Sequence, residues 1–294
     1  MKIVRIIGGL GNQMFQYAFL IALREKFKQK IYVDISSFNG YKLHNGLELE
    51  KIFNIKLNIA DPVDIRRLSY YSNNYIKQRL CRQLLPNKKT EYIESSKKNV
   101  IDNVFINSGD CYYEGYWQNH KYFHDYYNLI SKEFSFKLDN LCIKNKNIIE
   151  FIKNSLNPTV SIHIRRGDYV NNKYFKDICN IDYYNKSINE VLNVFPNAFF
   201  LIFSNDINWC KNNICKIIYN NNIIFVDWNN TDKSYIDMYI MSLCRINIIA
   251  NSSFSWWAAY LNKNKNKIVI APDKWINNNK LFKPQLPDWK LIQI

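Results

Sequence analysis

The chain has 294 residues and is therefore long enough for two domains of roughly 150 residues each. Hydrophobic residues make up 47% of it, which excludes disorder as the dominant state, and no apolar run approaches the roughly 18 residues of a membrane span. The net charge of +15 permits contact with polyanions, but the basic residues are scattered and carry no zinc-finger, basic-zipper or RNA-binding signature. We therefore expect a globular protein that does not bind nucleic acid.

The cysteines and the N-terminus indicate the compartment. The seven cysteines form an odd-numbered set without a C-x-x-C pair, which suits neither a disulfide framework nor a zinc site. The apolar N-terminal segment is interrupted by Arg5 and ends at Gly8, a pattern typical of a strand and not of a signal peptide. These features predict a cytoplasmic protein, and the basic charge leaves peripheral contact with an anionic inner membrane open.

The first half of the chain opens with the pattern of a doubly wound α/β domain. The predicted elements are, in order, a buried strand at 2–7, a sharp turn at 8–11, a buried helix at 12–27, a second strand at 30–34, helical segments within 62–84 and an aromatic stretch at 112–127.

The second half predicts a parallel sheet with helices on both faces. Expected strands at 159–164, 198–203, 223–227, 246–250 and 267–270 alternate with helical stretches at 182–195, 206–213, 232–244 and 252–262. The boundary between two α/β domains is expected around residues 154–158, which gives domains of residues 1–155 and 156–294.

The segment VSIHIRRGDY at 160–169 concentrates polar residues where a buried strand ends. Side chains alternate along a strand, so His163 and Arg165 share one face. Arg166 and Asp168 follow at the end of the strand, where ligands bind in α/β sheets. Guanidinium groups match phosphate oxygens in pairs, which favours recognition of an anion such as pyrophosphate. An ion-paired Arg–Asp turn without a ligand is the alternative.

A second polar segment, NSSFSWW at 251–257, follows the strand expected at 246–250. Its serines would begin a helix, whose first turn offers free N–H groups and the positive end of the helix dipole. Ser252 or Ser253 can also be a simple N-cap, and the two roles are compatible. Upstream, the carboxylate of Asp237 is a natural acceptor for the N–H donors of guanine.

The glycine-rich turn at 8–11 resembles a dinucleotide-binding fingerprint only loosely, because Met14 occupies the third glycine position. Asp34 at the end of the second strand would then bind a ribose, so an NAD-dependent oxidoreductase stays open as an alternative. Close approach of the backbone to a ligand explains the glycines equally well. The sequence contains no D-x-D pair of the kind that holds Mg²⁺ or Mn²⁺ in many sugar-nucleotide enzymes, which favours a reaction without a metal.

Five segments together resemble one enzyme family. GGLGNQMFQYA at 8–18, YYEGYWQ at 112–118, HIRRGDYV at 163–170, FSND at 203–206 and NSSFSWWAAYL at 251–261 resemble the inverting α-1,2-fucosyltransferases of glycosyltransferase family 11, in this order and over nearly the whole chain. The resemblance implies a GT-B-like α/β fold with two Rossmann-like domains facing a cleft. Residues 1–155 would lie on the acceptor side, and residues 156–294 would bind GDP-fucose above a parallel sheet.

The resemblance also implies roles for single residues. Arg165 would hold the β-phosphate beside His163, and Asp237 would read guanine. The residues expected to bind the donor are Gly9, Gly11, Asn12, His163, Arg165, Arg166, Asp237, Asn251, Ser252, Ser253 and Phe254. Where related α-1,6 enzymes carry a catalytic Glu, this chain has Lys173. The implied partners are GDP-fucose, which is a co-substrate and not a cofactor, and a galactose-containing glycan, free or lipid-linked.

The expected reaction is transfer of L-fucose to a galactoside hydroxyl with inversion and an α-1,2 linkage. Arg165 and Asp168 are the expected catalytic residues: Arg165 stabilises the leaving diphosphate, and Asp168 is either the base or a lock on the arginines. Glu114 is a further candidate base. Glu114, Tyr116, Trp117 and Gln118 would contact the acceptor, because aromatic rings pack against sugar C–H faces. A GT-B enzyme for another sugar nucleotide and a non-enzymatic glycan-binding protein are the remaining alternatives.

Overall fold

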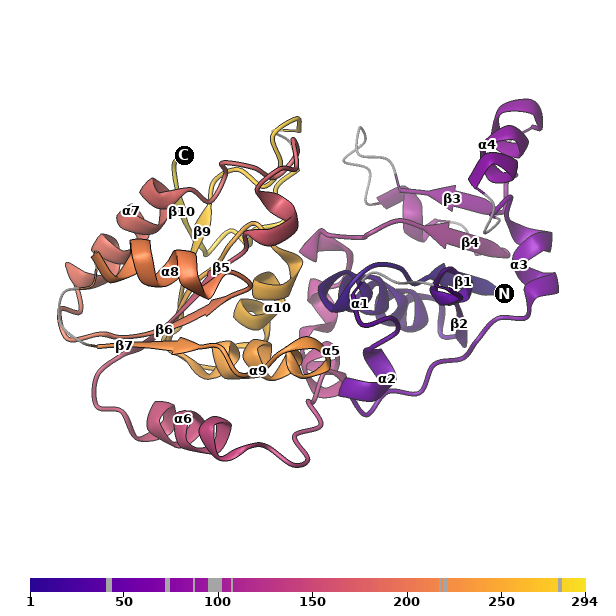
Figure 1. Cartoon of the computed structure of the whole chain (residues 1–294). Coiled ribbons are helices and arrows are strands. Elements are labelled where there is room, and N and C mark those ends of the chain that lie inside the picture. The colour runs from indigo at the N-terminus through magenta and orange to yellow at the C-terminus, as the bar shows by residue number, and fades with distance from the viewer. Residues whose placement is uncertain are drawn as a thin grey trace. The chain divides into compact units, whose positions relative to one another are not determined.

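The computed structural model, drawn in Figure 1, describes the chain except residues 41–43, 72–74, 87, 95–101, 107, 217, 219–221 and 280–281. The chain divides into two compact units, Met1–Lys137 and Leu138–Ile294. The division lies before the boundary expected after residue 155, because helix α6 (Ile143–Asn154) packs against helix α9 (Tyr235–Leu243) of the second unit.

The first unit is built on a four-stranded, fully parallel sheet in the order β2-β1-β4-β3. Its strands are β1 (Lys2–Arg5), β2 (Ile31–Asp34), β3 (Glu91–Ile93) and β4 (Cys111–Glu114). Strands β1 and β2 and the helix between them confirm the predicted opening. The short strands β3 and β4 fall in the part of the sequence where no strand was predicted.

The helices of the first unit are α1 (Leu10–Phe27), α2 (Leu49–Ile52), α3 (Pro62–Leu68), α4 (Tyr75–Leu84) and α5 (Tyr127–Glu133). Helix α1 is buried along most of its length, as its nearly all-round apolar sequence predicts. The helical segment expected within 62–84 is two helices. The first starts at Pro62, where the Asp61 side chain accepts a hydrogen bond from the backbone N–H of Val63, and it ends at Leu68.

The second unit is built on a six-stranded, fully parallel sheet in the order β10-β9-β8-β5-β6-β7. Its strands are β5 (Thr159–Ile164), β6 (Phe199–Ser204), β7 (Ile223–Val226), β8 (Ile246–Ile248), β9 (Ile268–Pro272) and β10 (Lys290–Ile292). Five of these strands were predicted, and β10 extends the sheet at its edge. The chain runs from β5 outward to β7 and then returns to place β8 on the other side of β5. The strand order therefore reverses between β5 and β8.

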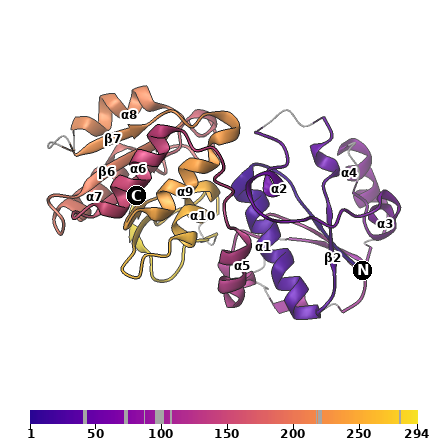
Figure 2. The same cartoon turned by 90° about the horizontal axis from the view of Figure 1, so that it is seen from below.

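Helices cover both faces of this second sheet (Figures 1 and 2). The helices are α6, α7 (Ile181–Leu192), α8 (Ile207–Asn213), α9 and α10 (Ser253–Leu261). One face packs the inward side chains of β5 against Tyr184 and Ile188 of α7. On the other face, Ser161 of β5 accepts a hydrogen bond from Asn247, which also donates to the backbone oxygen of Met241 in α9. The alternation predicted for β5 is confirmed, and so is the fold class of two α/β units.

Within the described parts of the chain, no helix combines the length and the apolar character needed to cross a bilayer.

Trp117 belongs to the aromatic core of the first unit. Its side chain has no exposed surface, and its ring stacks on Phe19 of α1 at 3.9 Å between centroids. Tyr122 packs edge-on against the same ring at 5.4 Å. The expectation that Trp117 lines an acceptor platform is therefore wrong in this structure, because the indole is enclosed by other rings. The neighbouring Tyr116 is 48% exposed.

We predict that Trp117→Ala lowers the free energy of unfolding by about 3–5 kcal/mol, because it leaves a cavity among packed rings. Tyr116→Ala, at the exposed neighbour, should change it by less than about 0.5 kcal/mol. Urea unfolding of the full chain followed by circular dichroism measures both. A Trp117→Ala protein as stable as the wild type, but with weaker acceptor binding, would restore the acceptor role.

Candidate functional site

The candidate site lies at the carboxyl ends of the central strands of the second unit. Strand β5 pairs with β8 on one side and with β6 on the other, so the residues that follow these three strands emerge side by side. Arg165 follows β5, Ser252 lies shortly after β8, and Asp206 lies shortly after β6. The reversal of strand order between β5 and β8 is the position where open α/β sheets bind ligands. The arginine segment and the serine-led helix thus meet on neighbouring strands, as predicted.

Among the described residues, the groups that hold the Arg165 side chain lie close to it in sequence. Its guanidinium Nη2 lies 2.7 Å from Oδ1 of Asp168, and its Cζ lies 5.5 Å from the centre of the Tyr169 ring. The Asp168 side chain is 57% exposed, so this pair is a solvent-screened ion pair of small net strength. The guanidinium can therefore exchange Asp168 for a stronger anionic partner.

Arg166 is fixed to the corner between β6 and α8. Its Nε lies 3.1 Å from Oδ2 of Asp206, and its guanidinium stacks on the Trp209 ring at 4.2 Å. Its backbone N–H donates to Oδ1 of Asn205 at 2.9 Å. A Cβ at Gly167 would lie 2.2 Å from Asn205 Nδ2, so a larger residue would displace the amide that holds the Arg166 backbone. These contacts indicate that Arg166 orients the turn, although the sequence placed it among the donor-binding residues.

His163 lies beneath the turn and is only 7% exposed. Its Nδ1 is buried without a hydrogen-bond partner in the described parts of the chain. Burial, together with the nearby Arg165 charge, lowers the pKa of His163 to about 3, so the imidazole is neutral at physiological pH. Its ring centre lies 5.6 Å from that of Phe254 in the first turn of α10. A neutral imidazole with an unused nitrogen thus lies against the start of this helix.

Helix α10 begins with the predicted serines. Ser252 is the N-cap, and its Oγ accepts a hydrogen bond from the backbone N–H of Phe254 at 3.4 Å. Asn251 is buried, and its Nδ2 donates to the backbone oxygen of Trp275 at 3.0 Å. Ser253 and Phe254 remain partly exposed, whereas Trp256 has no exposed surface and anchors the helix. The N-terminal end of α10, with its positive dipole, therefore points to the same edge as Arg165.

Asp237 lies in the first turn of α9, which starts at the carboxyl edge of the sheet because it follows β7. Its Oδ1 accepts a hydrogen bond from Nδ2 of Asn229 at 2.7 Å. Burial raises the pKa of Asp237 to about 7, and the Asn229 bond acts in the opposite direction. A carboxyl with a pKa near neutrality at the ligand-binding edge is a functional candidate. The sequence identified Asp237 but gave no sign of Asn229.

In the first unit, the glycine-rich turn and the end of β4 are joined by amides. Oδ1 of Asn12 accepts a hydrogen bond from Nε2 of Gln118 at 2.7 Å, and Nε2 of Gln16 donates to the backbone oxygen of Gly115 at 3.2 Å. Gly11 is buried within α1, and Gly9 is the residue before its first turn. These hydrogen bonds give the two amides a structural role in joining the segments, and donor binding by this turn stays a prediction.

The first N–H group of α1, that of Leu10, already has a protein acceptor. The buried Glu48 side chain accepts a hydrogen bond from the backbone N–H of Leu10, and burial raises the pKa of this carboxyl. Asp34 is also engaged: its Oδ1 accepts from the backbone N–H of Ser36 and its Oδ2 from the hydroxyl of Tyr112. With 1% of its surface exposed, Asp34 cannot bind a ribose. This correction removes the residue on which the oxidoreductase alternative depended.

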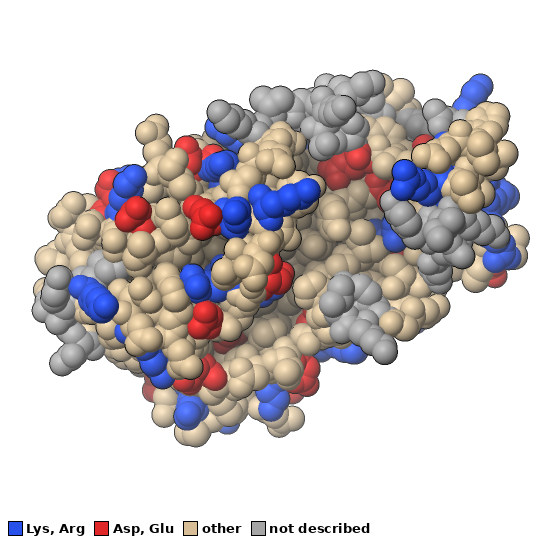
Figure 3. Space-filling view, turned by 45° about the horizontal axis from the view of Figure 1, so that its top comes forward, with Lys and Arg blue, Asp and Glu red and all other residues tan. Residues whose placement is uncertain are grey.

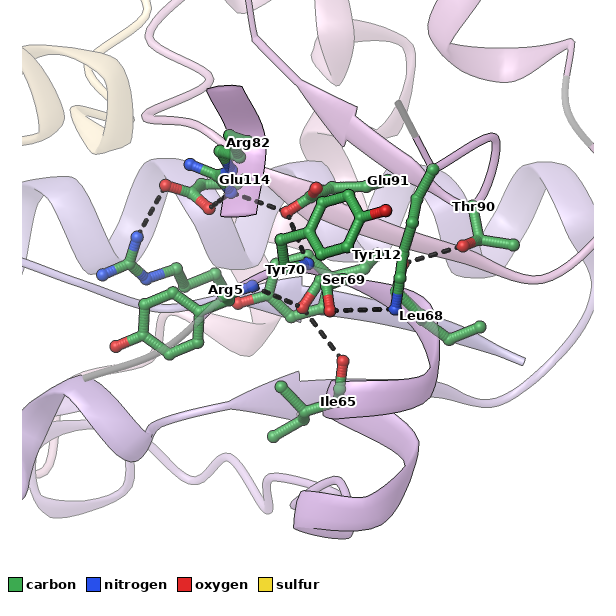
Figure 4. A network of polar contacts seen from close by, with 12 residues as sticks. Arg5, Ile65, Leu68, Ser69, Tyr70, Arg82, Thr90, Glu91, Tyr112 and Glu114 are labelled. Atoms are coloured by element: carbon green, nitrogen blue, oxygen red, sulfur yellow. Dashed lines mark hydrogen bonds and ion pairs between the residues drawn. The ribbon is translucent and has the colours of Figure 1, made fainter. Parts of the chain in front are cut away.

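Glu114 belongs to a chain of ion pairs in the first unit (Figure 4). Its Oε1 lies 2.7 Å from Nη1 of Arg5, and its Oε2 lies 2.7 Å from Nη2 of Arg82. Nη2 of Arg82 also lies 2.6 Å from Oε1 of Glu91. Both oxygens of Glu114 are therefore occupied by guanidinium groups, which disfavours its expected role as a base.

Sequence reasoning missed Glu94, which shapes the segment that follows β4. Its Oε2 accepts hydrogen bonds from the backbone N–H groups of Tyr116 and Trp117, both at 2.8 Å. Burial raises the pKa of Glu94. A Cβ at Gly115 would lie 2.5 Å from the Cβ of Glu94, so the two segments approach as closely as glycine allows. No sequence pattern around Glu94 indicates this contact, because Tyr116 and Trp117 lie more than twenty residues further along the chain.

The surface charges follow the scattered sequence pattern. On the face drawn in Figure 3, Lys and Arg side chains are interspersed with Asp and Glu side chains. Mixed charge of this kind differs from the continuous basic stripe of nucleic-acid-binding proteins.

The chain is similar to several known proteins. It is 33% identical to "Alpha-1,2-colitosyltransferase" of Escherichia coli, with 99% of this chain and 98% of that protein covered. It is also 33% identical to "O-antigen biosynthesis glycosyltransferase WbnK" of E. coli, with 96% and 97% covered. The identity with "Galactoside alpha-(1,2)-fucosyltransferase 2" of Mus musculus is 26%, with 97% of this chain and 76% of that protein covered.

A solved structure supports the fold. The α-1,6-fucosyltransferase NodZ, from Bradyrhizobium, superposes with a TM-score of 0.52 at 13% identity, with 90% of this chain and 96% of that chain covered, in a crystal soaked with GDP-fucose. The model of "Glycosyl transferase family 11" matches residues 1–293, which confirms the resemblance stated from the motifs. The chain therefore belongs to glycosyl transferase family 11 and is a glycosyltransferase.

Proposed function

We propose that the protein transfers L-fucose from GDP-β-L-fucose to a galactoside hydroxyl of a glycan, forming an α-1,2 linkage with inversion and without a metal. The observation that carries the proposal is the meeting of Arg165, neutral His163 and the start of α10 where the strand order reverses. That arrangement suits a diphosphate, and a relative in the same family is named as a galactoside α-1,2-fucosyltransferase.

Within this proposal the acceptor hydroxyl attacks C1 of fucose from the face opposite GDP. The new C1–O bond forms as the bond from C1 to the β-phosphate oxygen breaks, and negative charge grows on the diphosphate. Arg165 leaves Asp168 and, with the dipole of α10, stabilises that charge, so no metal is needed for this step. The hydroxyl proton passes to a base or to water. Asp168 positions Arg165 in the absence of a ligand, and its carboxylate, once Arg165 has moved to the diphosphate, is the candidate for that base.

The GDP derivative of colitose is a second candidate donor, because a relative with 33% identity is named as a colitosyltransferase. Colitose is L-fucose without its 3-hydroxyl, so both sugars fit the same nucleotide site and differ by one polar group. Rates with the GDP derivatives of the two sugars, compared at equal concentrations, decide between them. A site that hydrogen-bonds the 3-hydroxyl should prefer fucose strongly, because the missing group leaves buried partners unpaired.

The proposed acceptor is a galactose-containing glycan of the O-antigen type, since WbnK is named for that pathway. A lipid-linked form of this acceptor would bring the protein to the cytoplasmic surface of a membrane, which we propose as a peripheral contact. Of the four residues expected to contact the acceptor, Tyr116 has the most exposed side chain and is the one we assign to that role. Incubation with a panel of β-galactosides, followed by NMR of the product linkage, tests the acceptor.

We predict different outcomes for the two adjacent arginines. Arg165→Ala should lower kcat about a hundredfold, the typical effect of removing one charge-stabilising donor, and leave the melting temperature within about 2 °C of the wild type. Arg166→Ala should lower the melting temperature, because Asp206 and Trp209 lose their partner. Turnover assays in EDTA and thermal melts measure both effects. Turnover of Arg165→Ala within tenfold of the wild type contradicts the assignment.

We predict that GDP-fucose binding weakens in acid through Asp237. Guanine donates its N–H groups to an ionised carboxyl, whereas burial raises the pKa of Asp237 to about 7 before the ligand binds. The dissociation constant should therefore be about tenfold higher at pH 6 than at pH 8, because binding must first remove a proton. Calorimetry without acceptor measures this, since the diphosphate of GDP-fucose does not titrate in that range. Asp237→Asn should bind weakly with a flat pH profile; a wild-type slope in that variant would exclude Asp237 as the titrating group.

A further inference from the structure

A chain of side-chain amides ends on Asp237. Asn229, which lies between β7 and α9, donates from Nδ2 to Oδ1 of Asp237 at 2.7 Å and to Oδ1 of Asn145 at 3.0 Å. Asn145, on α6, donates in return from its Nδ2 to Oδ1 of Asn229 at 2.7 Å. Asn145 is 1% exposed and Asn229 is 6% exposed. Figure 2 shows α6 alongside α9, so the amide pair bridges two packed helices.

The direction of these hydrogen bonds is fixed by Trp228, which lies at the end of the amide series opposite Asp237. The indole Nε1–H of Trp228 can only donate, and it donates to Oδ1 of Asn145 at 2.7 Å. The oxygen of Asn145 must therefore face Trp228, and its NH₂ group must face Asn229. This in turn directs the NH₂ group of Asn229 towards Asp237. Oδ1 of Asp237 is thus always an acceptor, and any proton on this carboxyl must be on Oδ2.

The second oxygen of Asp237 is left for a ligand. Among the described residues no donor contacts Oδ2, although the side chain is largely buried. Asp237 is partly exposed, so Oδ2 can accept a hydrogen bond from a ligand N–H group, and the low polarity of its surroundings strengthens such a bond relative to one in water. Oδ1 keeps a second lone pair, which allows a two-point contact with the N1–H and the amino group of guanine.

We propose that Asn229, held in place by Asn145 and Trp228, is a positioning residue that fixes Asp237 for guanine and so sets the base preference of the enzyme. The inference rests on the proposed function, because it takes a guanine nucleotide as the ligand of Asp237. It adds residues from outside the segments that carry the family resemblance, and it places the start of α6 in the architecture of the base site.

The electrostatics of the neighbourhood support a specific role for Asn229. Its hydrogen bond lowers the pKa of Asp237 and opposes the effect of burial. The other charged or titratable groups on the packed elements are Asp227, Asp232, Lys233, Tyr235 and Tyr239 on and before α9, Tyr260 on α10, and Lys144, Lys146, Glu150 and Lys153 on α6. Nζ of Lys144 lies over the Trp228 ring at 5.2 Å. Burial raises the pKa of Tyr235 and Tyr239 above 10, so neither titrates near neutrality.

The test compares Asn229→Ala with the wild type in three measurements. The dissociation constant for GDP-fucose at pH 7.5 should rise about tenfold, the usual effect of losing a hydrogen bond to a charged group. The pH midpoint of binding should move upward, because the bond that favours the ionised carboxyl is gone. The ratio of the dissociation constants for inosine diphosphate, which lacks the amino group, and for GDP should be smaller at pH 8 in Asn229→Ala than in the wild type. At saturating donor, kcat should stay unchanged, because Asn229 does not touch the reacting atoms.

Two further variants keep the result interpretable. Asn262→Ala is the matched control: Asn262 is a buried amide of the same unit that donates to the backbone oxygen of Cys244 and to Oδ1 of Asn247, and among the described residues it has no hydrogen bond to Asp237, Asn229 or Asn145. It should lower stability without moving the pH midpoint. Trp228→Phe keeps an aromatic ring but removes the indole donor. It should shift the pH midpoint of binding in the same direction as Asn229→Ala by a smaller amount, and it provides the test if Asn229→Ala does not fold.

The outcomes separate the two proposals. If the wild type binds neither GDP nor GDP-fucose, the proposed function fails. If the wild type binds with a pH dependence that Asp237→Asn abolishes, while folded Asn229→Ala and Trp228→Phe keep the wild-type midpoint and the preference over inosine diphosphate, the positioning role is overturned. Equal changes in Asn229→Ala and in the Asn262→Ala control would also overturn it, because a general loss of stability would then explain both.

Discussion

The site of this protein depends on one topological constraint, the reversal of strand order between β5 and β8. In a parallel sheet the carboxyl ends of neighbouring strands lie at one edge, and crossover helices begin there. Because β5 and β8 are adjacent but far apart in sequence, the turn after β5 and the start of α10 must approach each other. At such a reversal the connections leave the two strands in opposite directions, so the polar groups at the edge are available to a ligand.

The charges on the segment after β5 are distributed so that Arg165 remains available to a ligand. His163 lies closest to the buried interior, where desolvation and the charge of Arg165 keep it neutral. Arg166 is engaged by Asp206 and Trp209 and acts as a support for the turn. Arg165, in contrast, is held within the described residues by the exposed carboxylate of Asp168 and the neighbouring ring of Tyr169. Two adjacent arginines of the same chemistry therefore have different roles, and the groups that each one faces decide which role it has.

The sequence predicted the second unit well because its signals are local. Each apolar run there is followed by a helical pattern, and periodicity identifies such elements within a few residues. Strands β3 and β4 were missed because they have only three and four residues. Strand β3 lies among polar residues, whereas β4 lies at the start of the aromatic stretch, where no alternation of apolar and polar residues marks a strand. Strand β10 was missed for a similar reason, since it is an edge strand of three residues. The motif after β5 was found because buried strands rarely end in several charged groups without a ligand, and the motif after β8 because its serines begin a helix directly after a buried strand.

The first unit shows why residue type alone misassigned several side chains. Asp34, Glu114 and Trp117 all carry the chemistry of ligand-binding residues, yet each meets a protein partner that lies far along the sequence. The Tyr112 hydroxyl donates a hydrogen bond to one oxygen of Asp34. Arg82 of α4 forms an ion pair with Glu114, and the Phe19 ring stacks on Trp117. Asn229 shows the opposite case. Its residue type suggested no role, and the role that we propose comes from its bond to the Asp237 carboxylate and, through Asn145, from the Trp228 indole, which no local sequence pattern connects to it. A side chain's chemistry limits its possible roles, whereas the partners that the fold brings to it select one of them.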